Sequence, residues 1–264
     1  MSLSIIIMAA GRGSRMKSEL PKVLHHAMGK PMLQYAIDAV KPLKPSKLVV
    51  VIGNGAELVK DQVQDKSITF VEQKELLGTG DAVATAMRHI KKGTVLVMNG
   101  DCPLITSKSL KQFLARHKRS KNDLSLLSFI DPEMSGYGRI FRDDAGNVTE
   151  IVEDKHATAE ERKIFTELNG GIYLISSDVL SYLDKVKLNR ASGEYYLTDL
   201  VEIAAKRKRK LNAYTCPAEE VRGVNSRREL YEVSDILRKK TIAALMDRGV
   251  TFIDPNSCII HGGL

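Results

Sequence analysis

Residues 4–16 read SIIIMAAGRGSRM, an apolar run that ends in two alanines and a glycine-rich turn. The apolar part, residues 4–8, is predicted to be the first strand of a sheet, because a short apolar run closed by glycine is typical of a buried strand. The turn leaves backbone N–H groups free to hold phosphate oxygens. Two cations, Arg15 and Lys22, follow on the same loop. The stretch therefore indicates a site for a polyphosphate.

The turn matches neither of two commoner phosphate-binding motifs. A P-loop requires a lysine at a spacing where this chain has none, and a dinucleotide motif requires a third glycine where Met16 stands. Taken alone, Gly-x-Gly also fits a simple turn, and Lys22 also fits a surface lysine. Pro21 stiffens the chain directly before the lysine, which favours the phosphate interpretation.

Strand-like and helix-like segments alternate through the first half of the chain. Strands are predicted at 48–52, 68–71 and 95–98, and helices at 32–40, 56–63, 80–90 and 107–117, the last with Ser107 as a candidate cap. This alternation predicts an α/β protein with a mainly parallel sheet flanked by helices. Ligands in such sheets bind beyond the carboxyl ends of the strands. The glycine loop and the segment 99–101, which follows the strand at 95–98, are therefore expected on one rim.

The pattern changes after residue 124 to a mixed α+β half. Strands are predicted at 124–130, 138–141, 148–152 and 171–175, with a turn at 144–147. Apolar residues at helical spacing then predict a long helix over 230–246. The chain is accordingly divided into a catalytic domain, residues 1–225, and a C-terminal helical arm with a short tail, residues 226–264.

Composition favours a soluble globular protein of the cytoplasm. The 264 residues are 43% hydrophobic, enough for one large core, and the longest apolar runs have only strand length. No signal-peptide pattern opens the chain, and Cys102, Cys216 and Cys258 are scattered and odd in number, as in a reducing compartment. The net charge of +8 concentrates at 206–210, which reads as a solvated helix end without interleaved aromatic residues. Neither a membrane nor a nucleic acid is expected as partner.

Residues 8–16, MAAGRGSRM, and 20–25, LPKVLH, resemble the opening of sugar-nucleotide pyrophosphorylases. The similarity is greatest to the uridylyltransferase domain of the bacterial bifunctional N-acetylglucosamine-1-phosphate uridylyltransferases. It continues in order through EQ (72–73), LGTG (77–80), NGDCPL (99–104), GYGRI (136–140), IVEDK (151–155), LNGG (168–171), GEYYLTD (193–199) and GVNSR (223–227). The resemblance implies the nucleotide-diphospho-sugar transferase fold, a Rossmann-like mixed sheet with a C-terminal helical arm.

The resemblance also implies a reaction. UMP would be transferred from UTP to N-acetylglucosamine-1-phosphate, giving UDP-N-acetylglucosamine and pyrophosphate for peptidoglycan synthesis. The sugar phosphate is already anionic, so it can attack the α-phosphorus in line without a covalent enzyme intermediate. Mg²⁺ is the expected cofactor. The family's left-handed β-helix acetyltransferase is not expected in this chain, because residues 258–263 leave no room for one coil.

Site residues follow from the same resemblance. Arg15 is assigned to the triphosphate leaving side and Lys22 to phosphate oxygens in the transition state, while Asp101 and Asn225 are the implied metal ligands. The implied substrate-binding residues are Ala9, Ala10, Gly11, Gly13, Gln73, Gly78, Thr79, Asn99, Gly138, Glu153, Asn169, Tyr196, Thr198 and Asn225.

Within this set, Ala10, Gly11, Gln73 and Gly78 are expected at uracil, where a glutamine amide offers one donor and one acceptor. The sugar phosphate is expected at Gly138, Glu153 and Asn169, with Tyr196 and Thr198 in the matching sugar-side segment. Simpler roles exist beside these. Thr79 could cap the helix at 80–90, Asp101 could be a turn carboxylate, and Asn225 could cap the last helix.

Three positions depart from the family pattern: Asn99 stands where tyrosine is usual, Asp81 where histidine is expected, and Gly170 where threonine is common. Two alternatives therefore stay open beside the uridylyltransferase. One is a nucleotidyltransferase for another sugar-1-phosphate, another NTP or a non-sugar phosphate. The other is a catalytically silent regulatory or nucleic-acid-binding relative. The oligomeric state is left open.

Overall fold

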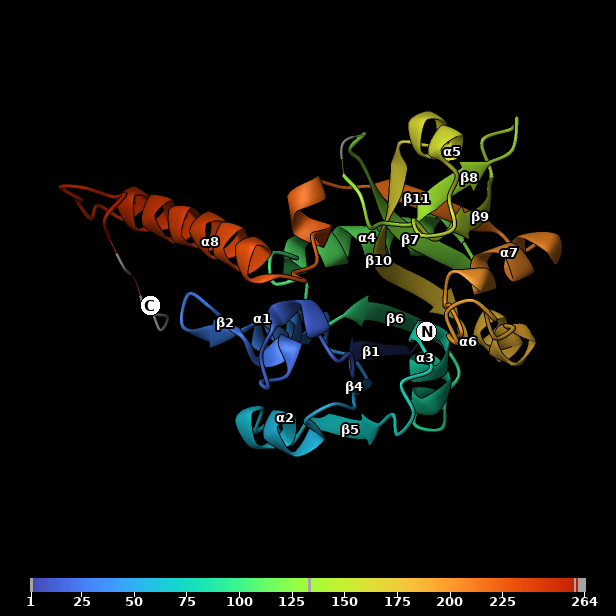
Figure 1. Ribbon diagram of the computed structural model, residues 1–264, viewed down its shortest axis with the longest axis horizontal. Helices are drawn as coiled ribbons and strands as arrows, with labels where there is room; N and C mark the ends of the chain where they lie inside the picture. Colours follow the sequence, from blue (N-terminus) through green and yellow to red (C-terminus); the bar gives the residue numbers. More distant parts are fainter. Residues whose placement is uncertain (1, 133, 259, 261–264) are drawn as a thin grey trace.

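Figure 1 shows the computed structural model, in which helices flank a central sheet and one long helix extends from the body. The structure describes residues 2–132, 134–258 and 260. The main path of the sheet has the order β11-β7-β10-β6-β1-β4-β5. Its strands are β1 (Leu3–Ala9), β4 (Lys47–Ile52), β5 (Ile68–Glu72), β6 (Thr94–Asn99), β7 (Leu124–Ile130), β10 (Glu167–Ser176) and β11 (Leu211–Thr215). Along this path every strand runs in the same direction except β10, which is antiparallel to both of its neighbours.

Helices cover both faces of the sheet, because its strands are apolar on both sides. Ile5 and Ile7 of β1 face a core that includes α1 (Met32–Val40), α2 (Ala56–Gln62) and α4 (Ser107–Ser120). Ile6 faces the opposite core, with α3 (Thr79–Met87), α6 (Ser177–Leu180) and α7 (Asp199–Lys206). Alternate side chains of a strand point to opposite faces, so one apolar run serves both cores. The predicted α/β class is confirmed.

The second half adds smaller elements around β10. A hairpin of β8 (Arg139–Arg142) and β9 (Val148–Val152) pairs with β10 through β8. The short helix α5 (Ala159–Ile164) follows, and a two-stranded ribbon, β2 (His26–Ala27) with β3 (Lys30–Pro31), lies apart from the sheet. The 3₁₀ turns are η1 (Ser14–Met16), η2 (Lys22–Leu24), η3 (Lys41–Leu43), η4 (Ser181–Lys185) and η5 (Ala218–Val221).

The long helix α8 (Arg227–Asp247) begins at a cap and continues away from the body (Figure 1). The Ser226 hydroxyl accepts the backbone N–H of Glu229 at 3.2 Å, which starts the helix earlier than its apolar spacing predicts. Leu230 and Val233 pack in a small core with Met16. The far end of the predicted tail, residues 259 and 261–264, lies outside the described residues.

Two further findings concern helices. The predicted cap of α4, Ser107, is wrong: the Thr106 hydroxyl accepts the Ser109 N–H at 3.1 Å, because Thr106 is the residue that still has extended backbone. Within the described part of the chain, no helix combines the length and apolar character that crossing a bilayer requires.

Candidate active site

Two adjoining cavities open at the carboxyl ends of the central strands. The larger has a volume of about 1040 Å³ and the smaller about 230 Å³. Met8, Thr79, Asn99 and Asp101 line both, so the cavities meet there. Met8 of β1 is in register with Asn99 of β6, and the Gly100 N–H donates to the Met8 carbonyl at 2.9 Å. The glycine loop and the segment 99–101 thus share one rim, as expected from parallel strands.

The glycine loop crosses closely over Lys22. Gly13 has φ +62°, and a Cβ there would lie 2.5 Å from the Cβ of Lys22. Only glycine fits a left-handed backbone at that distance from another side chain. Gly11 faces open space instead, with no atom within 4 Å of where a Cβ would be. Met16, at the place of the missing third glycine, is fully buried in the small core under α8. The loop therefore places the Lys22 side chain and exposed backbone N–H groups in the same cavity.

Lys22 joins the two predicted metal ligands. Its ammonium forms an ion pair with Asp101 Oδ2 and donates to Asn225 Oδ1 at 3.1 Å. The Lys22 and Asp101 side chains are only 15% and 12% exposed. A carboxylate oxygen and an amide oxygen are thus directed at one cation from two segments that are far apart in the sequence. These hard oxygen donors fit a magnesium ion, which takes one or two protein groups and completes its shell with water and phosphate.

Backbone contacts hold these two ligands in place. The Val224 N–H donates to the Asp101 carbonyl at 3.0 Å, and the Gly223 N–H donates to the hydroxyl of Tyr137 at 3.1 Å. Burial raises the pKa of Tyr137 to about 12. Burial, reinforced by Asp101, raises the pKa of the Cys102 thiol well above its usual value. Both groups stay protonated and neutral at physiological pH, so neither adds a charge beside the Lys22–Asp101 ion pair.

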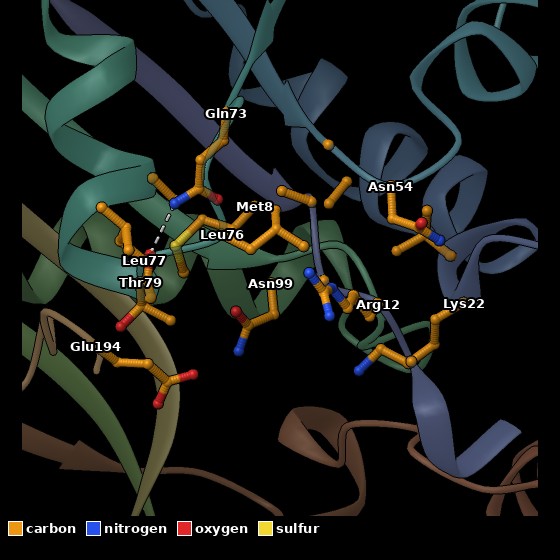
Figure 2. Close-up of a pocket in the computed structure, with 18 of the residues that line it drawn as sticks. Met8, Arg12, Lys22, Asn54, Gln73, Leu76, Leu77, Thr79, Asn99 and Glu194 are labelled. Carbon is orange, nitrogen blue, oxygen red and sulfur yellow. Dashed lines mark hydrogen bonds between the residues drawn. The ribbon is translucent and has the colours of Figure 1, made fainter. Parts of the chain in front are cut away.

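Gln73 lines the larger cavity and comes directly after β5 (Figure 2). Its side chain is 5% exposed. The amide nitrogen donates to the Gly78 carbonyl at 3.1 Å and to Asp81 Oδ2 at 2.6 Å. Both N–H groups of Gln73 are thus used inside the protein, and only the oxygen is left for a ligand. This differs from the expected pairing of one donor and one acceptor.

Three hydrogen bonds join the two halves of the chain beside this cavity. The Tyr195 N–H donates to the Leu77 carbonyl at 2.7 Å, and the Gly80 N–H donates to the Tyr195 carbonyl at 2.8 Å. The Leu197 N–H donates to the Thr79 hydroxyl at 3.0 Å. Thr79 therefore does not cap α3, whose cap residue is Gly78. The segment after β5 and the segment before α7 form one continuous wall.

The smaller cavity is lined by a carboxylate and an amide that are each already oriented. Glu153 Oε1 accepts from the Thr198 hydroxyl at 2.7 Å. Asn169 donates to the Tyr173 hydroxyl at 2.6 Å and accepts the Gly171 N–H at 3.0 Å. One N–H of the Asn169 amide and the second Glu153 oxygen have no such partner within the described residues. They suit a ligand with hydroxyl and carbonyl groups, such as an amino-sugar derivative.

A second carboxyl, Asp199, interacts with Glu153 but lines neither cavity. Burial, and then the charge of Glu153, raise the pKa of Asp199 to about 6. Burial raises the pKa of Tyr173 as well, with Glu153 as the next cause.

All the residues predicted for the site line these two cavities. The larger cavity includes Ala9, Ala10, Gly11, Gly13, Lys22, Gln73, Gly78 and Tyr196; the smaller includes Arg15, Gly138, Glu153, Asn169, Thr198 and Asn225; Thr79, Asn99 and Asp101 line both. Two positions differ from the expectation. Arg15, assigned to the triphosphate, lines the smaller cavity, and Tyr196, assigned to the sugar side, lines the larger one, with its hydroxyl donating to Ser192 Oγ at 2.5 Å.

Other lining residues were not predicted. Arg12 and Asn54 line the larger cavity, and Figure 2 shows both with Lys22 at the side opposite Gln73. The signal for Asn54 was available, because it follows the carboxyl end of β4 as Asp101 follows β6. Tyr137 and Gly223 line the smaller cavity. Among the described residues, no group of three or more His, Cys, Asp or Glu side chains is arranged to hold a metal ion.

A mainly parallel sheet flanked by helices, with a glycine loop and a lysine–carboxylate pair at one rim, defines an α/β protein whose ligand site lies at the carboxyl ends of the strands. The chain belongs to the family of MobA-like NTP transferase domains, whose model matches residues 5–167. It is 43% identical over 260 residues to the bifunctional protein GlmU of Thermoanaerobacter pseudethanolicus, covering 98% of this chain and 56% of that protein. It is 46% identical over 266 residues to the bifunctional protein GlmU of Alcanivorax borkumensis, covering 99% and 58%.

The chain thus spans a little over half the length of these relatives, and the resemblance stated from the sequence is confirmed. Among solved structures, a UDP-glucose pyrophosphorylase complexed with UDP-glucose matches with a TM-score of 0.76 at 22% identity, over 91% of this chain and 100% of that one. HddC from Yersinia pseudotuberculosis, complexed with GMP-PN, matches with a TM-score of 0.64 at 20% identity, over 90% and 100%. At such identities these two structures bear on the fold alone.

Proposed function

We propose that this protein transfers UMP from UTP to N-acetylglucosamine-1-phosphate, releasing pyrophosphate, in the cytoplasmic synthesis of peptidoglycan precursors. The observation that carries the proposal is the convergence of Lys22, Asp101 and Asn225 where the two cavities meet. A nucleotide in the larger cavity and a sugar phosphate in the smaller one would bring their phosphates together at that point. The similarity to proteins named GlmU supports the choice of substrates.

The residues of the chain would act by position and charge. The open backbone of the glycine loop and Arg12 would bind the triphosphate, and Gln73 would meet the base at the far end. Glu153 and Asn169 would orient the sugar so that its phosphate oxygen attacks the α-phosphorus in line. The Lys22 ammonium would stabilise the negative charge on the phosphate oxygens as the bond to pyrophosphate breaks. Arg15 stays assigned to the leaving phosphates, although it lines the smaller cavity.

Asp101 and Asn225 would hold Mg²⁺. When bound, the ion would neutralise phosphate charge and bring the two phosphates together. Lys22 now lies between the same two oxygens, so it would have to release at least one of them to reach the substrate. We also keep the proposed division into a catalytic domain, residues 1–225, and an arm from residue 226. The expectation that nucleic acid is not a partner stays a prediction.

The test is pyrophosphate release across a panel of NTPs and sugar-1-phosphates with Mg²⁺. UTP with N-acetylglucosamine-1-phosphate should give the highest kcat/KM, and Asp101→Asn should abolish most of the turnover. An exposed carboxylate that lines neither cavity, Glu57, provides the matched control Glu57→Gln. A clear preference for another pair would assign the protein to a different sugar or nucleotide. Absence of release with every pair would contradict nucleotidyl transfer itself.

A further inference from the structure

Two acceptors fix the side-chain amide of Gln73 in one orientation. Its nitrogen donates to the Gly78 carbonyl and to the Asp81 carboxylate, at 3.1 and 2.6 Å. Exchanging nitrogen and oxygen would set the amide oxygen against an oxygen on both sides, since neither acceptor has a proton to give. The nitrogen therefore faces the protein, and Figure 2 shows it directed along a hydrogen bond beside Thr79, with the oxygen turned the other way.

Helix α3 holds Asp81 in position to accept the hydrogen bond from Gln73. It is the third residue of α3 and lies in the first turn, where the backbone N–H groups stabilise a negative charge. The start of α3 is held by the Gly80 N–H bond to Tyr195. The carboxylate is half-buried, so its position is set by the helix rather than by a flexible surface loop.

We propose that Asp81 determines the nucleobase specificity of the site, because it holds Gln73 with only an acceptor toward the base. This inference rests on the proposed function in one respect, that the larger cavity takes the base of a nucleotide. An amide oxygen pairs with a ring N–H, such as N3–H of uracil. Cytosine has a lone pair at N3 instead, which would face the Gln73 oxygen without a proton between them.

Shape alone cannot make this distinction. UTP and CTP have nearly the same size, and a pocket discriminates poorly between isosteres unless a polar group is left unpaired. Leaving one buried acceptor against another is expected to weaken CTP binding on the order of 100-fold relative to UTP. Asp81 contacts Gln73 and does not itself line the cavity, so it is a positioning residue.

Calorimetric binding of UTP and of CTP to the whole chain tests the proposal. The wild-type protein should bind UTP on the order of 100-fold more tightly. Asp81→Asn replaces the shorter of the two contacts with a group that can donate to a reversed Gln73 amide, so only the longer contact, to the Gly78 carbonyl, still opposes reversal. The ratio of UTP to CTP affinity should therefore fall to about 10-fold or less, mainly through tighter CTP binding. Asp81→Glu keeps an obligate acceptor and should retain most of the ratio. A merely structural role for Asp81 would weaken both nucleotides equally.

Several outcomes would overturn the proposal: equal binding of UTP and CTP by the wild type, no binding of either, or an unchanged ratio in Asp81→Asn. If Asp81→Asn does not fold, Asp81→Ser, which also carries a proton to donate, replaces it. Binding needs no sugar phosphate, so the two proposals fail separately. A correct binding ratio without pyrophosphate release contradicts only the proposed function, and release with unselective binding contradicts only the role of Asp81.

Discussion

Replacing Lys22 by methionine is expected to affect turnover and stability in different ways. Methionine keeps most of the apolar stem but removes the ammonium that pairs with Asp101 and Asn225. The loss of one charged donor from the reacting phosphates should lower kcat by about 100- to 1000-fold. The Asp101 carboxylate, 12% exposed, is left without its cation, which should cost about 1–3 kcal/mol. In a chain of this size that corresponds to roughly 2–10 °C in Tm.

The same geometry predicts a contrast in the response to Mg²⁺. In the wild type, an added ion would compete with Lys22 for the Asp101 and Asn225 oxygens. In Lys22→Met these oxygens are free, so Mg²⁺ should raise the Tm of the variant more than that of the wild type. Thermal unfolding with and without Mg²⁺, at about 10 mM for a weak site, measures the shift in Tm. Pyrophosphate release measures the loss of turnover. Lys30→Met, which removes an exposed ion pair, is the control. Equal Mg²⁺ shifts in both proteins, or near-normal turnover in Lys22→Met, would refute the reasoning.

Three further outcomes are expected. Gly78→Ala should lower the free energy of unfolding in urea by about 2 kcal/mol or more, because φ is +98° and a Cβ would lie 2.6 Å from the Tyr195 carbonyl oxygen. The control Gly146→Ala has φ +80° but a Cβ there would meet no atom within 4 Å, so this variant should lose less stability. The pKa of Asp199 in the folded protein is about 6, above its usual value of 3.8, so wild-type stability should fall as pH rises from about 4 through 6. Asp199→Asn should remove that slope, with a gain of about 1 kcal/mol at pH 7 after solvent screening, and an unchanged slope in pH-dependent unfolding would contradict the assignment. Tyr137→Phe removes the acceptor for the Gly223 N–H. The loss of this hydrogen bond, about 1 kcal/mol, should lower kcat a few-fold with little change in the KM for UTP, which steady-state kinetics can measure.

The parallel half of the fold was predictable because each strand there is a continuous apolar run. The helix at 32–40 has the predicted bounds, and β1 and β4 differ by a residue at their ends. The elements that sequence reasoning missed lack such a signal. Helix α5 buries none of its residues and depends on the capping box of Thr158 and Glu161. Strand β11 is an edge strand with few buried residues, and α6 is a single turn.

The membership of the site was predictable from residue type and resemblance, whereas its internal contacts were not. The hydrogen bond between Lys22 and Asn225 joins residues 203 positions apart, a pairing that no spacing rule contains. The side of the site that Arg15 and Tyr196 line depends on where the loops turn, which propensities do not specify. The orientation of the Gln73 amide follows from acceptors that come together only when α3 is in place.

The three hydrogen bonds that join residues 77–80 to residues 195–197 have a consequence for folding during synthesis. The Leu197–Thr79 bond spans 118 positions, and Asn225 is added later still. Long-range contacts of this kind form only after the intervening chain has been made and ordered. The N-terminal strands can therefore associate while the ribosome is still translating, but the nascent chain should bind no nucleotide until its C-terminal third has emerged. A stalled chain that ends before residue 195 would carry the glycine loop without a complete pocket.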